Sequence, residues 1–187
     1  MSLELTLKSG TFLELATGKV IKGKEMQVFG EYFPAITPAL SEYGIQPLRS
    51  FAVLATNTRG IAAEMGSLTQ YPQTENYTRF INDARFLKAK PLRDDGLEFL
   101  ADGNFFTSLD KTITLRTDAN YALIIAKGNP LNSEPLLELP TVEDGTTQIY
   151  SGKSITLHPW NDNAALILNT SPDEALIFKI RFNPSDA

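Results

Sequence analysis

The chain contains a single histidine, His158, and no cysteine, which limits the chemistry that its side chains can perform. Because the chain has no thiol, it can form no disulfide, no thiolate metal site and no cysteine nucleophile. A serine–histidine relay would need His158 as its base, yet no Gly-x-Ser-x-Gly motif occurs. His158 stands at the end of an expected strand, in Leu157-His158-Pro159-Trp160. We therefore expect a surface or capping histidine, no metal site and no cofactor.

Acidic residues offer candidate acid–base groups, but each of them stands beside a glycine. The positions are Asp94-Asp95 before Gly96, Asp102 before Gly103, and Glu143-Asp144 before Gly145. Carboxylates can transfer protons in a reaction, whereas aspartate next to glycine is also typical of turns. We favour turns at all three places. The chain also lacks a P-loop and a dinucleotide-binding fingerprint, so the sequence predicts no nucleotide cofactor.

Arg93 and Trp160 each have two interpretations. Arg93 closes an expected helix, where it either binds a substrate carboxylate or stabilises the free carbonyls of the helix end. Trp160, the only tryptophan, lies near Tyr150 in the expected β-rich half, where the two rings form a ligand shelf or anchor the core. The helix-end and core interpretations are the simpler ones.

Composition and charge narrow the class of protein. The 187 residues are 42% hydrophobic and 21% charged, which is typical of a folded chain. The net charge is -5 and no long basic run occurs, so we expect no nucleic-acid partner. No apolar run approaches the roughly 20 residues of a membrane span, so we expect no membrane partner and a cytoplasmic location.

The first half of the chain alternates strands and helices. Leucines at positions 3, 5 and 7 predict a strand, and a second strand follows at 12–15. Met26, Phe29, Phe33, Ile36, Leu40 and Tyr43 recur at helical spacing before Gly44, interrupted by Pro34 and Pro38. A hairpin is expected at 49–68, a helical region after Thr74 with a second start at Asp83, and strands at 97–107. This order predicts a ferredoxin-like α+β domain over residues 1–110.

The second half, residues 111–187, has a different pattern. Short apolar segments alternate with turns, and no internal repeat is visible. The apolar segments are 113–115, 121–126, 136–139, 155–157, 164–168 and 175–182. This spacing predicts a β-rich extension or a small β-sandwich unit.

Two stretches resemble a known family. Tyr32-Phe-Pro-Ala-Ile-Thr-Pro-Ala-Leu-Ser-Glu-Tyr-Gly44 is similar to a helix of the DUF1330 group in the dimeric α+β barrel superfamily, and Phe80-Ile-Asn-Asp-Ala-Arg-Phe-Leu-Lys-Ala-Lys-Pro-Leu-Arg93 is similar to that group's later helix. The resemblance covers about residues 12–108. It implies one half of a barrel, whose open sheet face pairs with a second copy in a homodimer.

The resemblance also implies a pocket between the helices and the sheet. Tyr32, Tyr71, Tyr77, Arg85 and Arg93 are then the residues expected to contact a small anionic or aromatic ligand. The alternative for the tyrosines is ordinary packing, since a tyrosine often buries its ring and hydrates its hydroxyl.

Three functional hypotheses remain open at this point. The chain is a homodimeric barrel protein with a small-molecule-binding or structural role. It is instead a cofactor-independent enzyme of the monooxygenase or isomerase type. In the third hypothesis the β-rich half binds the ligand and the first half forms the dimer. Fold alone does not choose among them.

Overall fold

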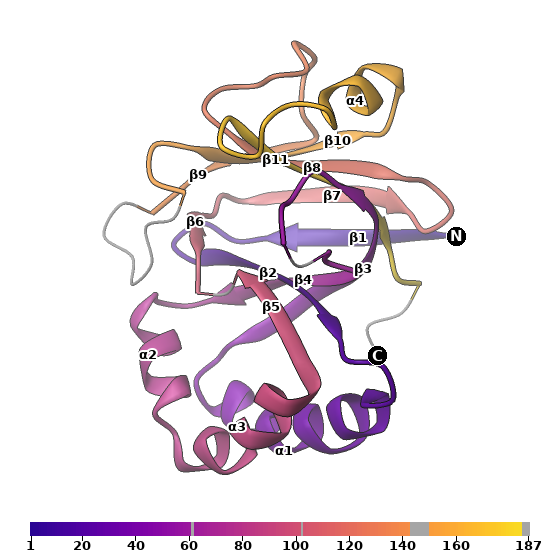
Figure 1. The fold of residues 1–187 in the computed structure, drawn as a ribbon. Coiled ribbons are helices and arrows are strands. Elements are labelled where there is room, and N and C mark those ends of the chain that lie inside the picture. The colour runs from indigo at the N-terminus through magenta and orange to yellow at the C-terminus, as the bar shows by residue number, and fades with distance from the viewer. Residues whose placement is uncertain (61, 102, 143–149, 185–187) are drawn as a thin grey trace.

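The computed structural model describes residues 1–60, 62–101, 103–142 and 150–184 (Figure 1). The strands are β1 (Ser2–Leu7), β2 (Phe12–Val20), β3 (Gln46–Thr56), β4 (Met65–Tyr71), β5 (Leu97–Ala101), β6 (Phe105–Thr107), β7 (Lys111–Arg116), β8 (Tyr121–Ala126), β9 (Leu137–Pro140), β10 (Ser154–Pro159) and β11 (Ala175–Phe182). The helices are the π-helix η1 (Met26–Tyr32), α1 (Phe33–Glu42), α2 (Glu75–Ile81), α3 (Ala84–Gly96) and α4 (Asp162–Ile167). None of the described helices is long and apolar enough to span a membrane.

The first half of the chain has the predicted ferredoxin-like arrangement. Its strands lie in the order β5-β2-β4-β3 and pair antiparallel. One helical connection joins β2 to β3, a second joins β4 to β5, and both lie on the same face of the sheet (Figure 1). The α+β fold class is therefore confirmed, and it follows from the order of elements visible in the sequence.

The second half repeats this strand order without a visible sequence repeat. Its strands lie in the order β11-β8-β10-β9, so the last, first, third and second strands again lie side by side. A connection over residues 127–136 replaces the first helix, and the short α4 replaces the second. The expected strand at 164–168 is wrong, because Asn161 caps a helix there: its Oδ1 accepts a hydrogen bond from Ala164 N at 2.9 Å.

The two halves join into one sheet rather than forming a separate sandwich. Strand β3 pairs with β11 on one side, and on the other side Phe106 of β6 forms a bridge with Thr141, next to β9. Val142 N also donates to Phe105 O at 2.9 Å. These contacts close the sheet into a barrel within a single chain.

The open sheet face that motivated the predicted homodimer is buried inside this barrel. Leu13, Leu15 and Leu68 from the first half share one apolar core with Leu123 and Phe178 from the second half. A second copy cannot cover the same face unless this core opens. The chain's own second half supplies the partner sheet.

The ribbon of β1 and β7 lies between the two halves of the sheet (Figure 1). Its two strands pair antiparallel, from Ser2 opposite Arg116 to Leu7 opposite Lys111. Leucines on one face enter the barrel core, while the residues between them are exposed. The predicted domain boundary at residue 110 lies just before β7, which pairs with the N-terminal strand β1.

The helical stripe starts differently from the prediction. Met26 was expected to share the stripe that faces the sheet, but its exposed fraction is 75%, and Phe29 remains 52% exposed. Residues Met26–Tyr32 form a π-helix, whose wider turn shifts the phase of the side chains, so that Val28 is buried instead. The regular α1 begins at Phe33, with Pro34 in its first turn, where a missing amide is tolerated.

Candidate functional site

A cavity of about 520 Å³ lies between the helices and the outer face of the sheet in the first half. Its floor comes from β2, β3 and β4, and its roof comes from η1, α1, α2 and α3. Cavities that hold small molecules typically measure about 300–1,000 Å³. On the equivalent face of the second half, Leu131 and Ala164 pack onto β8 and β11.

Small side chains on the floor leave this space open. Ala16, Ser50, Ser67 and Thr69 line the cavity, together with Gly18. They share one face because alternate residues of a strand point to the same side and paired residues lie opposite each other. The large leucines of the same strands point the other way, into the barrel.

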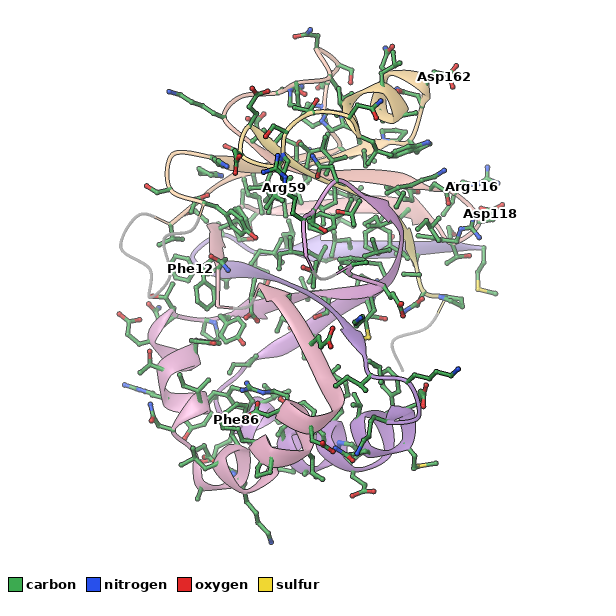
Figure 2. All side chains as sticks on the ribbon, viewed as in Figure 1. Phe12, Arg59, Phe86, Arg116, Asp118 and Asp162 are labelled. Carbon is green, nitrogen blue, oxygen red and sulfur yellow. The ribbon has the colours of Figure 1, made fainter. Side chains whose placement is uncertain are left out.

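The roof of the cavity is aromatic. Phe29 and Phe33 stack with ring centroids 5.9 Å apart, and Phe80 and Phe86 lie 4.8 Å apart. Figure 2 places Phe86 within the helical layer below the sheet. Such rings offer a large apolar contact area to a planar ligand.

Glu14 of β2 is the charged group of the cavity floor, and sequence analysis did not single it out. Only 6% of Glu14 is exposed. Its Oε1 accepts a hydrogen bond from Gly103 N at 2.8 Å, and the Tyr71 hydroxyl lies beside the same carboxylate. Burial, followed by the nearby charge of Glu14, raises the pKa of Tyr71 well above its usual value. Tyr71 therefore keeps its hydroxyl proton and can donate a hydrogen bond.

Gly103 is needed at this position for two reasons. Its φ of +66° is favourable mainly for glycine. A Cβ there would also lie 2.9 Å from Cζ of the Tyr77 ring. The absence of a side chain thus lets the Gly103 amide reach Glu14 while Tyr77 packs alongside. The Tyr77 and Tyr71 rings both meet Phe105 edge to face, at centroid distances of 5.8 and 5.0 Å.

The structure brings most of the predicted site residues together. Tyr32, Tyr71, Tyr77 and Arg93 all line the cavity. They come from η1, β4, α2 and α3, so elements that are distant in sequence converge on one space. Arg85 is not among the lining residues.

Arg93 lies both at a helix end and at the cavity wall. It lies in the last turn of α3 and lines the cavity, with 17% of its side chain exposed. Its guanidinium lies 5.0 Å from the centre of the Phe86 ring, and its Nη2 lies 2.8 Å from Asp94 Oδ1. Asp94 thereby balances the charge that Arg93 brings to the cavity.

Arg85 instead organises the start of α3. It lies 2.7 Å from Asp83 and 2.8 Å from Glu42. Asp83, the predicted cap, accepts a hydrogen bond from Arg85 N at 2.8 Å. Hydrogen bonds from the Arg85 side chain and backbone lower the pKa of Asp83. The expectation that Arg85 contributes to the pocket is therefore not met by its position, because its guanidinium is held by these carboxylates.

The other acidic candidates lie at surface ion pairs or outside the described residues. Lys24 Nζ lies 2.6 Å from Asp95, and Lys90 pairs with Asp94. Asp102, Glu143, Asp144 and Gly145 fall outside the described part of the chain. Within that part, no cluster of three or more histidine and acidic side chains gathers around one point.

The prediction of a surface or capping His158 is wrong, since its exposed fraction is 1%. It lies on the outer face of β10 and is covered by the connection between β8 and β9, where Ser133 Oγ is 3.3 Å from its Nδ1. Burial lowers the pKa of His158, partly opposed by the charge of Glu138. Trp160 is half-buried beside it in the chain, with Lys179 Nζ 4.8 Å from its ring centre.

No family model matches the sequence, and no curated protein does. Several solved structures are weakly similar. One is a mutant chlorite dismutase from Candidatus Nitrospira defluvii, with a TM-score of 0.47, 10% identity, 92% of this chain covered and 91% of that one. Another is a putative monooxygenase from Lactobacillus acidophilus, with a TM-score of 0.41, 11% identity, and 92% and 93% covered.

A third is a protein of unknown function from Rhodopseudomonas palustris, with a TM-score of 0.40, 14% identity, 58% of this chain covered and 83% of that one. Likeness at this level assigns no activity, so the functional argument rests on the cavity itself. The strand order of the chain is that of two ferredoxin-like halves closed into one α+β barrel.

Proposed function

We propose that the chain binds a small, largely apolar aromatic molecule in the cavity between the helices and the sheet. The supporting observation is the cavity of about 520 Å³ with an aromatic roof and a floor of small side chains. A packed core normally leaves few voids larger than a water molecule. An open space of this size between two layers therefore favours a ligand over a purely structural role.

Naphthalene is a suitable probe, since it is apolar, planar and fluorescent. We expect naphthalene to bind the purified chain with one site per chain in a fluorescence titration. Ser67→Phe places a ring on the cavity floor and should weaken binding about tenfold or more, because burying an aromatic surface is what drives binding.

The matched control is Thr114→Phe, which adds a ring on the exposed face of β7, outside the cavity. It should leave naphthalene binding unchanged. Equal weakening in both variants, or no effect of Ser67→Phe, contradicts the proposed site.

A single chain completes the barrel in this proposal. The predicted homodimer was assigned to the inner face of the first sheet, and β8 to β11 of the same chain now cover that face. The DUF1330 relationship and the cytoplasmic location stay predictions.

A second candidate function is a cofactor-independent isomerase, which the Glu14–Tyr71 pair favours. A buried carboxylate such as Glu14 can take a proton from carbon next to a ketone and return it at another carbon, with no oxidant needed. The probe is 2-tetralone in D₂O. We expect deuterium incorporation faster than in buffer and loss of this acceleration in Glu14→Gln. The isomerase is rejected if deuterium exchange proceeds at the rate seen in buffer, or if Glu14→Gln leaves the rate of exchange unchanged.

A further inference from the structure

The cavity has two chemically different sides. Its roof consists largely of aromatic and aliphatic side chains, whereas polar groups follow one another across the floor. Glu14 lies opposite Thr69 in the β2–β4 ladder, and Ser67 lies opposite Ser50 in the β4–β3 ladder. A ligand that fits both sides carries a flat apolar body with polar substituents on its edge.

Glu14 determines which polar substituent fits. A carboxylate accepts hydrogen bonds through two oxygens and can hold several donors at once. Gly103 N–H, a neutral donor, bonds to it, and the neutral Tyr71 hydroxyl lies beside it. A further neutral donor fits beside these two, whereas an anionic group placed beside the carboxylate would be repelled.

Arg93 does not reverse this preference. Its guanidinium is engaged by Asp94 at 2.8 Å and lies against Phe86. A second cation in the cavity would meet this guanidinium, and a ligand anion would compete with Asp94. A neutral hydroxyl group avoids both costs and gains a hydrogen bond to a charged acceptor, which is stronger than one between neutral groups.

From this arrangement we propose that the cavity is specific for hydroxylated aromatic molecules, with a phenolic hydroxyl donating a hydrogen bond to Glu14. The aromatic ring lies against the phenylalanines of the roof, and the hydroxyl faces β2. This inference rests on the proposed function, because it assigns the class of ligand that the same cavity binds.

The test compares naphthalene with four 2-substituted derivatives at pH 7: naphthol, methoxynaphthalene, naphthoate and naphthylmethylammonium. The methoxy compound keeps the ring and the oxygen of naphthol but carries a methyl group in place of the donor hydrogen. We expect naphthol to bind at least about tenfold more tightly than methoxynaphthalene, the usual effect of a hydrogen bond to a charged group. In Glu14→Gln this preference should fall below about threefold, because the charged acceptor becomes a neutral one. Glu138→Gln, at an exposed position of β9, is the control and should retain the full preference.

Each other outcome rejects the inference. Equal binding of naphthol and methoxynaphthalene, or an unchanged preference in Glu14→Gln, shows that Glu14 does not recognise the hydroxyl. Tightest binding of naphthoate assigns recognition to Arg93, and tightest binding of the ammonium compound makes the cavity a cation site. If naphthalene itself fails to bind, the proposed function falls as well, so the two failures are distinguishable.

Discussion

The hydroxyl of Tyr71 lies beside the carboxylate of Glu14 across the ladder between β4 and β2. Glu14 lies opposite Thr69, so Tyr71 is its diagonal neighbour two residues further along β4. Long side chains reach each other at this spacing. The pair thereby joins a buried charge to a buried phenol at the floor of the cavity.

Replacing Tyr71 by phenylalanine should change how stability depends on alkaline pH. The pKa of Tyr71 is raised in the folded state, so the folded chain keeps this proton while the unfolded chain loses it above about pH 10. The free energy of unfolding therefore falls as pH rises through this range. Urea unfolding at pH 8 and pH 10.5 should show a smaller fall in Tyr71→Phe than in the original chain.

Tyr150 provides the internal comparison for this experiment. Burial raises the pKa of Tyr150 to about 12, and this effect is present in both proteins. Only the difference between the two proteins reports on Tyr71. Parallel loss of stability in both would contradict a raised pKa of the buried Tyr71 in the folded chain.

Two glycines should differ in how well they tolerate alanine. A Cβ at Gly66 would lie 2.4 Å from Cζ of Phe51 and 2.7 Å from the carbonyl oxygen of Ala16, inside the barrel. Since neither neighbour can move freely, Gly66→Ala should lower the free energy of unfolding by about 1–3 kcal/mol. Chemical denaturation measures this loss.

Gly30→Ala is the matched control. Its Cβ would approach only the Met26 side chain, with Sδ at 2.5 Å, and that exposed side chain can turn away. We expect a change within about 0.5 kcal/mol. A tolerated Gly66→Ala would mean that the barrel packs less tightly between β2, β3 and β4 than described.

His158 should make the protein less stable in mild acid. Its pKa is lowered in the folded state, chiefly by burial. Above about pH 6.5 both states are neutral, and as pH falls below this value the unfolded chain takes up a proton first. The free energy of unfolding should therefore decrease between pH 8 and pH 5.5. His158→Gln removes the titrating group, so its stability should change less over the same interval. A steeper change in the variant would argue against a buried neutral histidine.

The barrel also predicts the mass of the particle in solution. Because the second half covers the inner face of the first, we expect light scattering after size exclusion to give the chain mass of 20.6 kDa. A particle of twice this mass at micromolar concentration would show that another surface associates, or that the halves exchange between chains.

Local patterns in the sequence were sufficient for the first half of the fold. The alternation around Leu13, the helical spacing before Gly44 and the cap at Asp83 each specify an element, and their order specifies the ferredoxin-like topology. The second half was harder, because strand periodicity does not say which strands pair. The joining of β3 to β11 depends on contacts between residues more than 120 positions apart.

The candidate site was also partly predictable from the sequence. Tyr32, Tyr71, Tyr77 and Arg93 line the cavity where the family resemblance placed a pocket. Glu14 was missed because a charged residue between two leucines in a strand normally indicates a solvent-facing position. Only the helices packed over that face make Glu14 buried. The available signal was a charged residue that alternates with leucines in a strand expected to be covered by helices.

The most direct test of the central claim is a crystal structure of the chain soaked with 2-naphthol. We predict that the naphthalene ring lies between α1, α3 and the sheet, with its oxygen within hydrogen-bond distance of a Glu14 carboxylate oxygen. Naphthol bound outside this cavity, or bound inside it with its oxygen turned toward Arg93 and away from Glu14, would contradict the account.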